Sequence, residues 1–232
     1  MKLKHISHLI TGSVMELFGV MADGKVENSY ELTNKRGAKL KVINYGATVT
    51  SLKIPLKSGE MVDVVLGFDT LENYINSFDL ESAPYLGATV GRYAGRINNA
   101  TFNLNGEIIH LDKNNNGHSL HGGKDNFSKK VWEVKNVNEG CSPSITFGYL
   151  SPANEGNYPG DLSVELTYTL SENNELIIEY NAQTTEDTVL NLTHHSYFNL
   201  DGHDSSVSEQ ELIVNSHKML ETTTENIPTG RV

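Results

Sequence analysis

The sequence predicts an all-β protein, a sandwich or a barrel. Short segments in which apolar and polar residues alternate recur along the chain, and turn residues separate them. Helical spacing of apolar residues is confined to residues 70–77. The 232 residues can bury one substantial core, and no repeat, low-complexity tract or linker divides them. Residues 1–232 are therefore expected to form a single domain.

The expected strands lie between residues 39 and 184, within the segments 39–56, 61–68, 101–111, 144–150, 162–170 and 175–184. Turn chemistry lies between them at Ser58-Gly59, Asn105-Gly106, Pro159-Gly160 and Asn173-Asn174. The clearest unit is a hairpin over residues 162–183, with its turn at 172–174.

Residues 190–200, with the sequence LNLTHHSYFNL, form a segment with two dissimilar faces if the chain is extended. One face is mostly apolar and suits a core: Leu190, Leu192, His194, Ser196 and Phe198. The other face carries hydrogen-bonding groups that suit a polar cleft: Asn191, Thr193, His195, Tyr197 and Asn199. Within that row only His195 titrates near neutral pH, which makes it the natural proton carrier.

Composition excludes several classes of function. A net charge of -11 argues against a nucleic-acid partner, which selects for a basic face. No stretch approaches the ~20 apolar residues that span a bilayer, so no membrane association is expected. His8, Thr11 and Glu16 interrupt the apolar run near the amino terminus, so a cleaved signal peptide is not expected. Cys141 is the only cysteine, and a cytoplasmic location is the default.

Three further segments could carry chemistry. Arg92 and Arg96 lie among glycines in residues 86–102, where Arg96 could present a donor fork to sugar hydroxyls or remain a surface arginine. His118 and His121 are three residues apart, so in an extended chain their rings point to opposite faces and make a poor metal pair. Tyr158, in a turn-rich connection, could stack on a sugar or plug its own loop.

The ordered motifs GRYAGRI, NGHSLHGG, NYPGDL and LNLTHHSYFNL resemble those of the galactose mutarotases, also called aldose 1-epimerases. The segments VINYGATVTSLKIP and DVVLGFDTLENY are similar to the amino-terminal part of that family, so the resemblance covers essentially the whole chain. It implies a large antiparallel β-sandwich with an open sugar cleft and no metal or organic cofactor.

The resemblance also implies roles for individual residues. Arg96 and His121 would bind substrate, His195 would be the general acid, and Tyr197 would lie in the same strand of the site. Gly95 stands where some members have asparagine, so one side-chain hydrogen bond is expected to be absent. The implied activity interconverts the α and β anomers of hexoses such as galactose and glucose, with a small aldose as the partner.

The family's general base is a glutamate near the carboxyl end, and the resemblance implies that this chain stops at ENIPTGRV before reaching it. Asp201, Glu221 and Glu225 are substitutes only by default. We therefore expect a sandwich truncated at its carboxyl-terminal end, weak activity or none, and self-association through exposed sheet edges.

Four other functions remain open. A non-catalytic carbohydrate-binding sandwich is the main alternative, because the base is not identified. A glycoside hydrolase needs a pair of carboxylates that the motifs do not mark. A metal-dependent enzyme is disfavoured by the histidine spacing. A phosphosugar epimerase requires a basic phosphate pocket, which the acidic composition does not favour.

Overall fold

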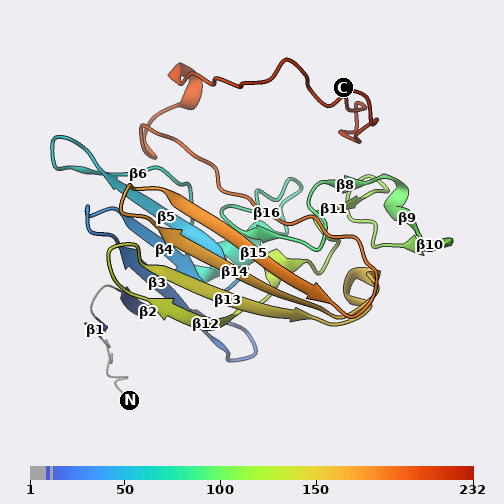
Figure 1. Ribbon diagram of the computed structural model, residues 1–232, viewed down its shortest axis with the longest axis horizontal. Coiled ribbons are helices and arrows are strands. Elements are labelled where there is room, and N and C mark those ends of the chain that lie inside the picture. Colours follow the sequence, from blue (N-terminus) through green and yellow to red (C-terminus); the bar gives the residue numbers. More distant parts are fainter. Residues whose placement is uncertain (1–8, 11–12) are drawn as a thin grey trace.

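Two large antiparallel sheets, packed face to face, make up most of the fold (Figure 1). The computed structural model describes residues 9–10 and 13–232, so part of the segment considered as a signal peptide lies outside the described residues. The first sheet has the order β1-β2-β3-β4-β5-β6, with strands Leu9–Ile10, Ser13–Val20, Val26–Thr33, Lys39–Ile43, Thr48–Pro55 and Met61–Asp63. The second has the order β12-β13-β14-β15, with strands Glu133–Asn138, Ser144–Ser151, Leu162–Leu170 and Leu176–Thr184.

The described residues also form three separate two-stranded sheets: β16-β7, β11-β8 and β10-β9. Their strands are β7 Thr89–Val90, β8 Arg96–Ile97, β9 Thr101–Leu104, β10 Glu107–His110, β11 Ser119–Leu120 and β16 Thr193–His194. The helical elements are α1 Leu71–Ser77 and the 3-10 turns η1 Asn98–Ala100, η2 Phe127–Lys129, η3 Glu155–Asn157 and η4 Val207–Glu209. No helix among the described residues is long and apolar enough to cross a bilayer.

The main core lies between the two large sheets and follows the alternation in the sequence. In β14 every second side chain is buried, from Leu162 to Leu170, while the intervening residues reach the surface to varying degrees. The first sheet contributes apolar side chains such as Leu40 and Val42 to the same core. The hydroxyl of Tyr168 in β14 donates a 2.6 Å hydrogen bond to the carbonyl of Ala47, which ties the two sheets together.

The all-β prediction is confirmed, and so are its clearest local elements. The β14–β15 hairpin turns through residues 171–175, with Asn174 at φ 64°. The predicted helix is α1, and the side chain of Thr70 caps it by accepting a hydrogen bond from the Asn73 N–H.

Other local expectations were wrong. The strand predicted over residues 61–68 ends at Asp63, and residues 190–200 are not one strand, since only Thr193–His194 pairs regularly. The strands β2, β3 and β12 were not predicted. In β2 and β12 the alternation is disguised because most side chains are exposed, and a bulge breaks the register of each.

Arg92 is the most heavily bonded buried side chain of the fold. Its guanidinium is 2% exposed, and all five of its N–H groups donate at 2.8–3.0 Å. The acceptors lie in residues 151–160: the hydroxyl and carbonyl of Ser151 and the carbonyls of Pro152, Pro159 and Gly160. Arg92 therefore holds this loop against its own segment.

Arg92→Lys is expected to destabilise the protein, because lysine has three donors and leaves buried carbonyls without partners. The cost should be about 2–4 kcal/mol in the free energy of unfolding, measured by urea denaturation. The exposed Arg36→Lys serves as the control and should change stability by less than ~0.5 kcal/mol. A loss at Arg92 no larger than that of the control would contradict this role.

Glu27 in β3 is buried and forms no ion pair with any described residue. Burial is the main cause, and the negative charge of Asp23 the second, of a rise in the pKa of its carboxyl to about 7. Lys25 and the side chain of Asn44 oppose it without cancelling it. Because the unfolded pKa is near 4.5, the stability that this group contributes is lost as pH rises from 4.5 to about 7.

Glu27→Gln, which is neutral at every pH, is therefore expected to stabilise the protein at pH 8. The gain should be on the order of 3 kcal/mol and should vanish near pH 4.5, as measured by denaturant unfolding at both values. The exposed Glu172→Gln provides the matched control. An equal effect of Glu27→Gln at the two pH values would show that burial does not raise the pKa of the Glu27 carboxyl.

Candidate active site

Residues 191–199 run extended between two parts of the fold. At one end the Asn191 N–H donates to the Arg92 carbonyl, and the Ala94 N–H donates to the Asn191 carbonyl. In the middle, β16 pairs with β7, and the His195 N–H donates to the Ala88 carbonyl. At the other end the Asn199 N–H donates to Val64. Backbone bonds on both sides therefore fix the position of His195.

The imidazoles of His121 and His195 lie edge to face, with ring centroids 5.3 Å apart. The ring of Tyr85 contacts both imidazoles, with its centroid 5.0 Å from that of His121 and 5.9 Å from that of His195. The ring of Tyr197, which is exposed, has its centroid 5.3 Å from that of His195. The structure thus brings His121, His195 and Tyr197 together, although His121 and His195 are 74 positions apart.

His121 is held as a neutral imidazole with a defined tautomer. Its Nδ1 accepts a 3.1 Å hydrogen bond from the Gly95 N–H, so the ring proton is on Nε2. Burial is the main cause that lowers the pKa of His121 to about 4, and the charges of His195 and Arg96 contribute smaller parts of the same shift. Near neutral pH, His121 therefore offers an Nε2–H donor and no charge.

The glycines after His121 have a steric role. His121 is at φ 55° and Gly122 at φ 90°, so the chain reverses there. A Cβ on Gly122 would lie 2.0 Å from the carbonyl oxygen of Gly91, so no other residue fits this close approach.

Arg96 lies beside His121 because β8 pairs with β11, which places Arg96 opposite Leu120. The Nε–H of Arg96 donates a 2.9 Å hydrogen bond to Oδ1 of Asn115. One edge of the guanidinium is thereby fixed, and its terminal nitrogens make no side-chain bond to any described residue. All four residues singled out from the sequence therefore lie in one region.

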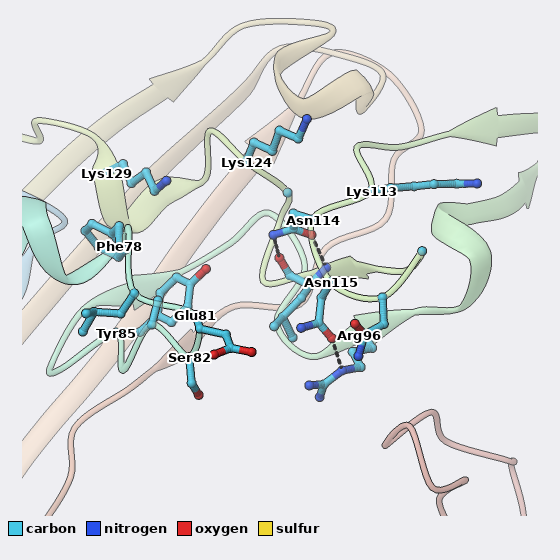
Figure 2. A pocket seen from close by; sticks show the side chains of 16 residues that line it. Phe78, Glu81, Ser82, Tyr85, Arg96, Lys113, Asn114, Asn115, Lys124 and Lys129 are labelled. Carbon is cyan, nitrogen blue, oxygen red and sulfur yellow. Dashed lines mark hydrogen bonds between the residues drawn. The ribbon is translucent and has the colours of Figure 1, made fainter.

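A cavity of about 520 Å³ adjoins this group and shares Tyr85 and Arg96 with it. Figure 2 shows Asn114, Asn115 and Arg96 on one side and Phe78, Tyr85 and Lys129 on the other. The volume of this cavity is typical of small-molecule sites.

The sequence missed two members of this region. Tyr85 is buried at φ 52° and has no motif of its own, and only the fold brings its ring to the two histidines. Asn115 lies in a run of three asparagines that looks like a simple loop. The run of asparagines before SLHGG was the only available signal, and it does not indicate which side chain contacts Arg96.

The two-face prediction for residues 190–200 is only partly right. His194 packs on the ring of Tyr168 at 5.7 Å, as a core residue should, and burial lowers its pKa to about 4. Phe198, however, is 51% exposed and Asn199 is 4% exposed, the reverse of the predicted faces. The segment leaves β7 after His195 and joins residues 64–66, so strict alternation ends there.

The remaining candidates lie outside this group. His118 accepts a hydrogen bond from the Asn99 N–H, and its Nε2 is 3.5 Å from Glu225. Glu221 pairs with Arg231, and Asp201 contacts Gln210. Tyr158 is 1% exposed and stacks on Phe102, so it fills its loop. In the part of the chain that the structure describes, no three His, Cys, Asp or Glu side chains form a metal-binding group.

Comparisons with known proteins agree with this geometry. A family model described as aldose 1-epimerase matches residues 28–232. A human galactose mutarotase is 40% identical over 195 residues, which are 84% of this chain and 54% of that protein. An aldose 1-epimerase from Haemophilus influenzae is 37% identical over 212 residues, covering 89% of this chain and 58% of that protein. The chain thus spans about half the length of the curated relatives it matches.

The fold comparison gives the same result. A crystal structure of an aldose epimerase homologue from C. elegans superposes with a TM-score of 0.77 at 36% identity, covering 86% of this chain and 59% of that one. A galactose 1-epimerase from Lactobacillus acidophilus gives a TM-score of 0.70 at 27% identity, covering 82% of this chain and 53% of that one.

The tautomer of His121 is directly measurable. We expect two-dimensional ¹H–¹⁵N spectra to show its proton on Nε2, with no titration of His121 between pH 5.5 and 8, because its pKa is about 4. The assignment is made with His121→Gln, whose spectrum should lack only that ring. A midpoint near 6.5 for His121 would contradict both the burial and the Gly95 hydrogen bond.

Proposed function

Because the chain belongs to the aldose 1-epimerase family, we propose that it binds a hexose such as galactose or glucose and interconverts its α and β anomers. The observation that carries the proposal is the pair of imidazoles 5.3 Å apart, one of them neutral, beside the fixed guanidinium of Arg96. Two imidazoles in contact and a neighbouring guanidinium supply the hydrogen-bonding groups that suit a polyhydroxylated ligand.

The reaction opens and recloses a hemiacetal. The proton of the hydroxyl on carbon 1 leaves, the ring oxygen gains a proton, and the bond between carbon 1 and the ring oxygen breaks. Rotation about the bond between carbons 1 and 2, followed by reclosure with the proton transfers reversed, gives the other anomer. Protons and electrons balance, so no oxidant or cofactor is required.

In this proposal, His195 in its protonated form donates to the ring oxygen as general acid. His121, fixed as the Nε2–H tautomer, would donate a hydrogen bond to the sugar and orient it, since it remains neutral at working pH. Arg96 would bind sugar oxygens with its free terminal nitrogens, and Tyr197 would border the open side of the site.

The proposed mechanism assigns the general acid to a residue but not the general base. Among the described residues, no carboxylate forms an ion pair with His121 or His195. General acid catalysis by one group is worth ~10²–10⁴-fold, so His195 acting alone is expected to accelerate mutarotation modestly.

The broader setting is also proposed. We expect one domain over residues 1–232, a cytoplasmic location, and a small aldose as partner, without nucleic acid or membrane. Self-association is expected through outer strands such as β15, which ends its sheet.

His195→Ala is expected to abolish whatever acceleration this chain gives to the mutarotation of fresh α-D-galactose, followed by polarimetry. His217→Asn, an exposed histidine outside the site, is the control and should keep the wild-type rate. Full activity of His195→Ala would remove His195 from the acid role. Sugar binding without acceleration by folded wild-type protein would replace catalysis with simple carbohydrate binding.

A further inference from the structure

The charge of the cavity beside Arg96 differs from that of the chain as a whole. The chain has a net charge of -11, yet the cavity is lined by Arg96, Lys113, Lys124 and Lys129 and by one carboxylate, Glu81. None of these four cations forms an ion pair with a described carboxylate. Excess positive charge in a concave site concentrates anions there.

Hydrogen bonds fix the wall that carries Arg96. Asn114 donates to the Leu120 carbonyl and accepts from the Leu120 N–H, at 2.9 and 2.7 Å. Asn115 accepts from Nε of Arg96, which turns the terminal nitrogens of the guanidinium away from Asn115 (Figure 2). The asparagine loop is therefore a preformed wall, and Arg96 lies where the cavity meets the histidine pair.

The opposite wall carries Lys129. Its ammonium lies 5.2 Å from the centre of the Phe78 ring, an attraction that holds the long side chain across the cavity wall. Lys113 and Lys124 both point away from the other lining side chains, so the inference depends mainly on Arg96 and Lys129 (Figure 2). The nearby Asp125 does not neutralise them, because it pairs with Lys130 at 2.7 Å.

We propose that this cavity binds the anionic group of a substituted sugar, a phosphate or carboxylate remote from the anomeric carbon, while the sugar ring lies against His121 and His195. The inference rests on the proposed function for the position of the ring, and it extends the substrate class from neutral hexoses to acidic ones. Lysine and arginine are the side chains that suit such oxyanions.

The test is calorimetric titration of the whole chain with D-galactose, D-galactose 6-phosphate, D-galacturonate and inorganic phosphate. We expect at least one acidic sugar to bind about tenfold more tightly than galactose at low ionic strength, and most of this advantage to disappear near 0.3 M salt. Inorganic phosphate alone should bind far more weakly, because it lacks the ring.

Lys129→Met, which keeps the apolar stem over Phe78, should reduce the advantage of the acidic sugar about threefold to tenfold and leave galactose binding unchanged. Lys124→Met, at an exposed position, should reduce this advantage less than Lys129→Met does, and Lys35→Met removes an equal charge outside the cavity. Lys35→Met should leave the affinities for acidic sugars and galactose unchanged, apart from the small effect of net charge on binding of the acidic sugars.

The inference would be overturned if acidic sugars bound no more tightly than galactose, or if inorganic phosphate bound as tightly as the acidic sugars. Equal weakening by Lys129→Met and Lys35→Met would overturn it as well. Failure of the proposed function is separate, since it would appear as absent mutarotation of galactose even where the lysine-dependent binding is intact.

Discussion

The buried guanidinium of Arg92 is the contact on which the site region depends. It donates all five N–H groups to the loop of residues 151–160, while its own carbonyl accepts from Asn191. Three segments far apart in the sequence are thereby joined at one residue. The backbone groups of the neighbouring Ala94 and Gly95 bond to Asn191 and His121, so residues 92–95 contact both candidate site segments while the guanidinium anchors them to the loop.

Burial and local charge set the chemistry of the site. His121 is neutral because burial, His195 and Arg96 all disfavour its protonation, and the Gly95 N–H selects its tautomer. A ring fixed in this way can donate but cannot act as an acid near neutral pH, which is why His195 is the acid in the proposed mechanism. Arg96, fixed through its Nε–H bond to Asn115, lies between this pair and a cavity lined mostly by cations.

Much of the fold was predictable, because buried strands such as β14 and β15 alternate and their turn residues are distinctive. The outer strands β2 and β12 were not, since exposed strands place few side chains in a core and leave little pattern to read. The two-face prediction for residues 190–200 was only partly right for a different reason. The segment changes partners from β7 to residues 64–66, and a two-residue period cannot reveal a change of neighbour.

The sequence by itself determined the all-β class, the family resemblance and the identity of His195, His121, Arg96 and Tyr197 as the residues to examine. Only the tertiary structure decided that Tyr85 contacts both histidines, that Asn115 holds Arg96, and that Arg92 is structural. The physical reason is that these properties depend on distance and burial between segments tens of residues apart. Local composition and spacing specify the strands, whereas proximity between distant side chains and the resulting pKa shifts exist only once the chain has folded.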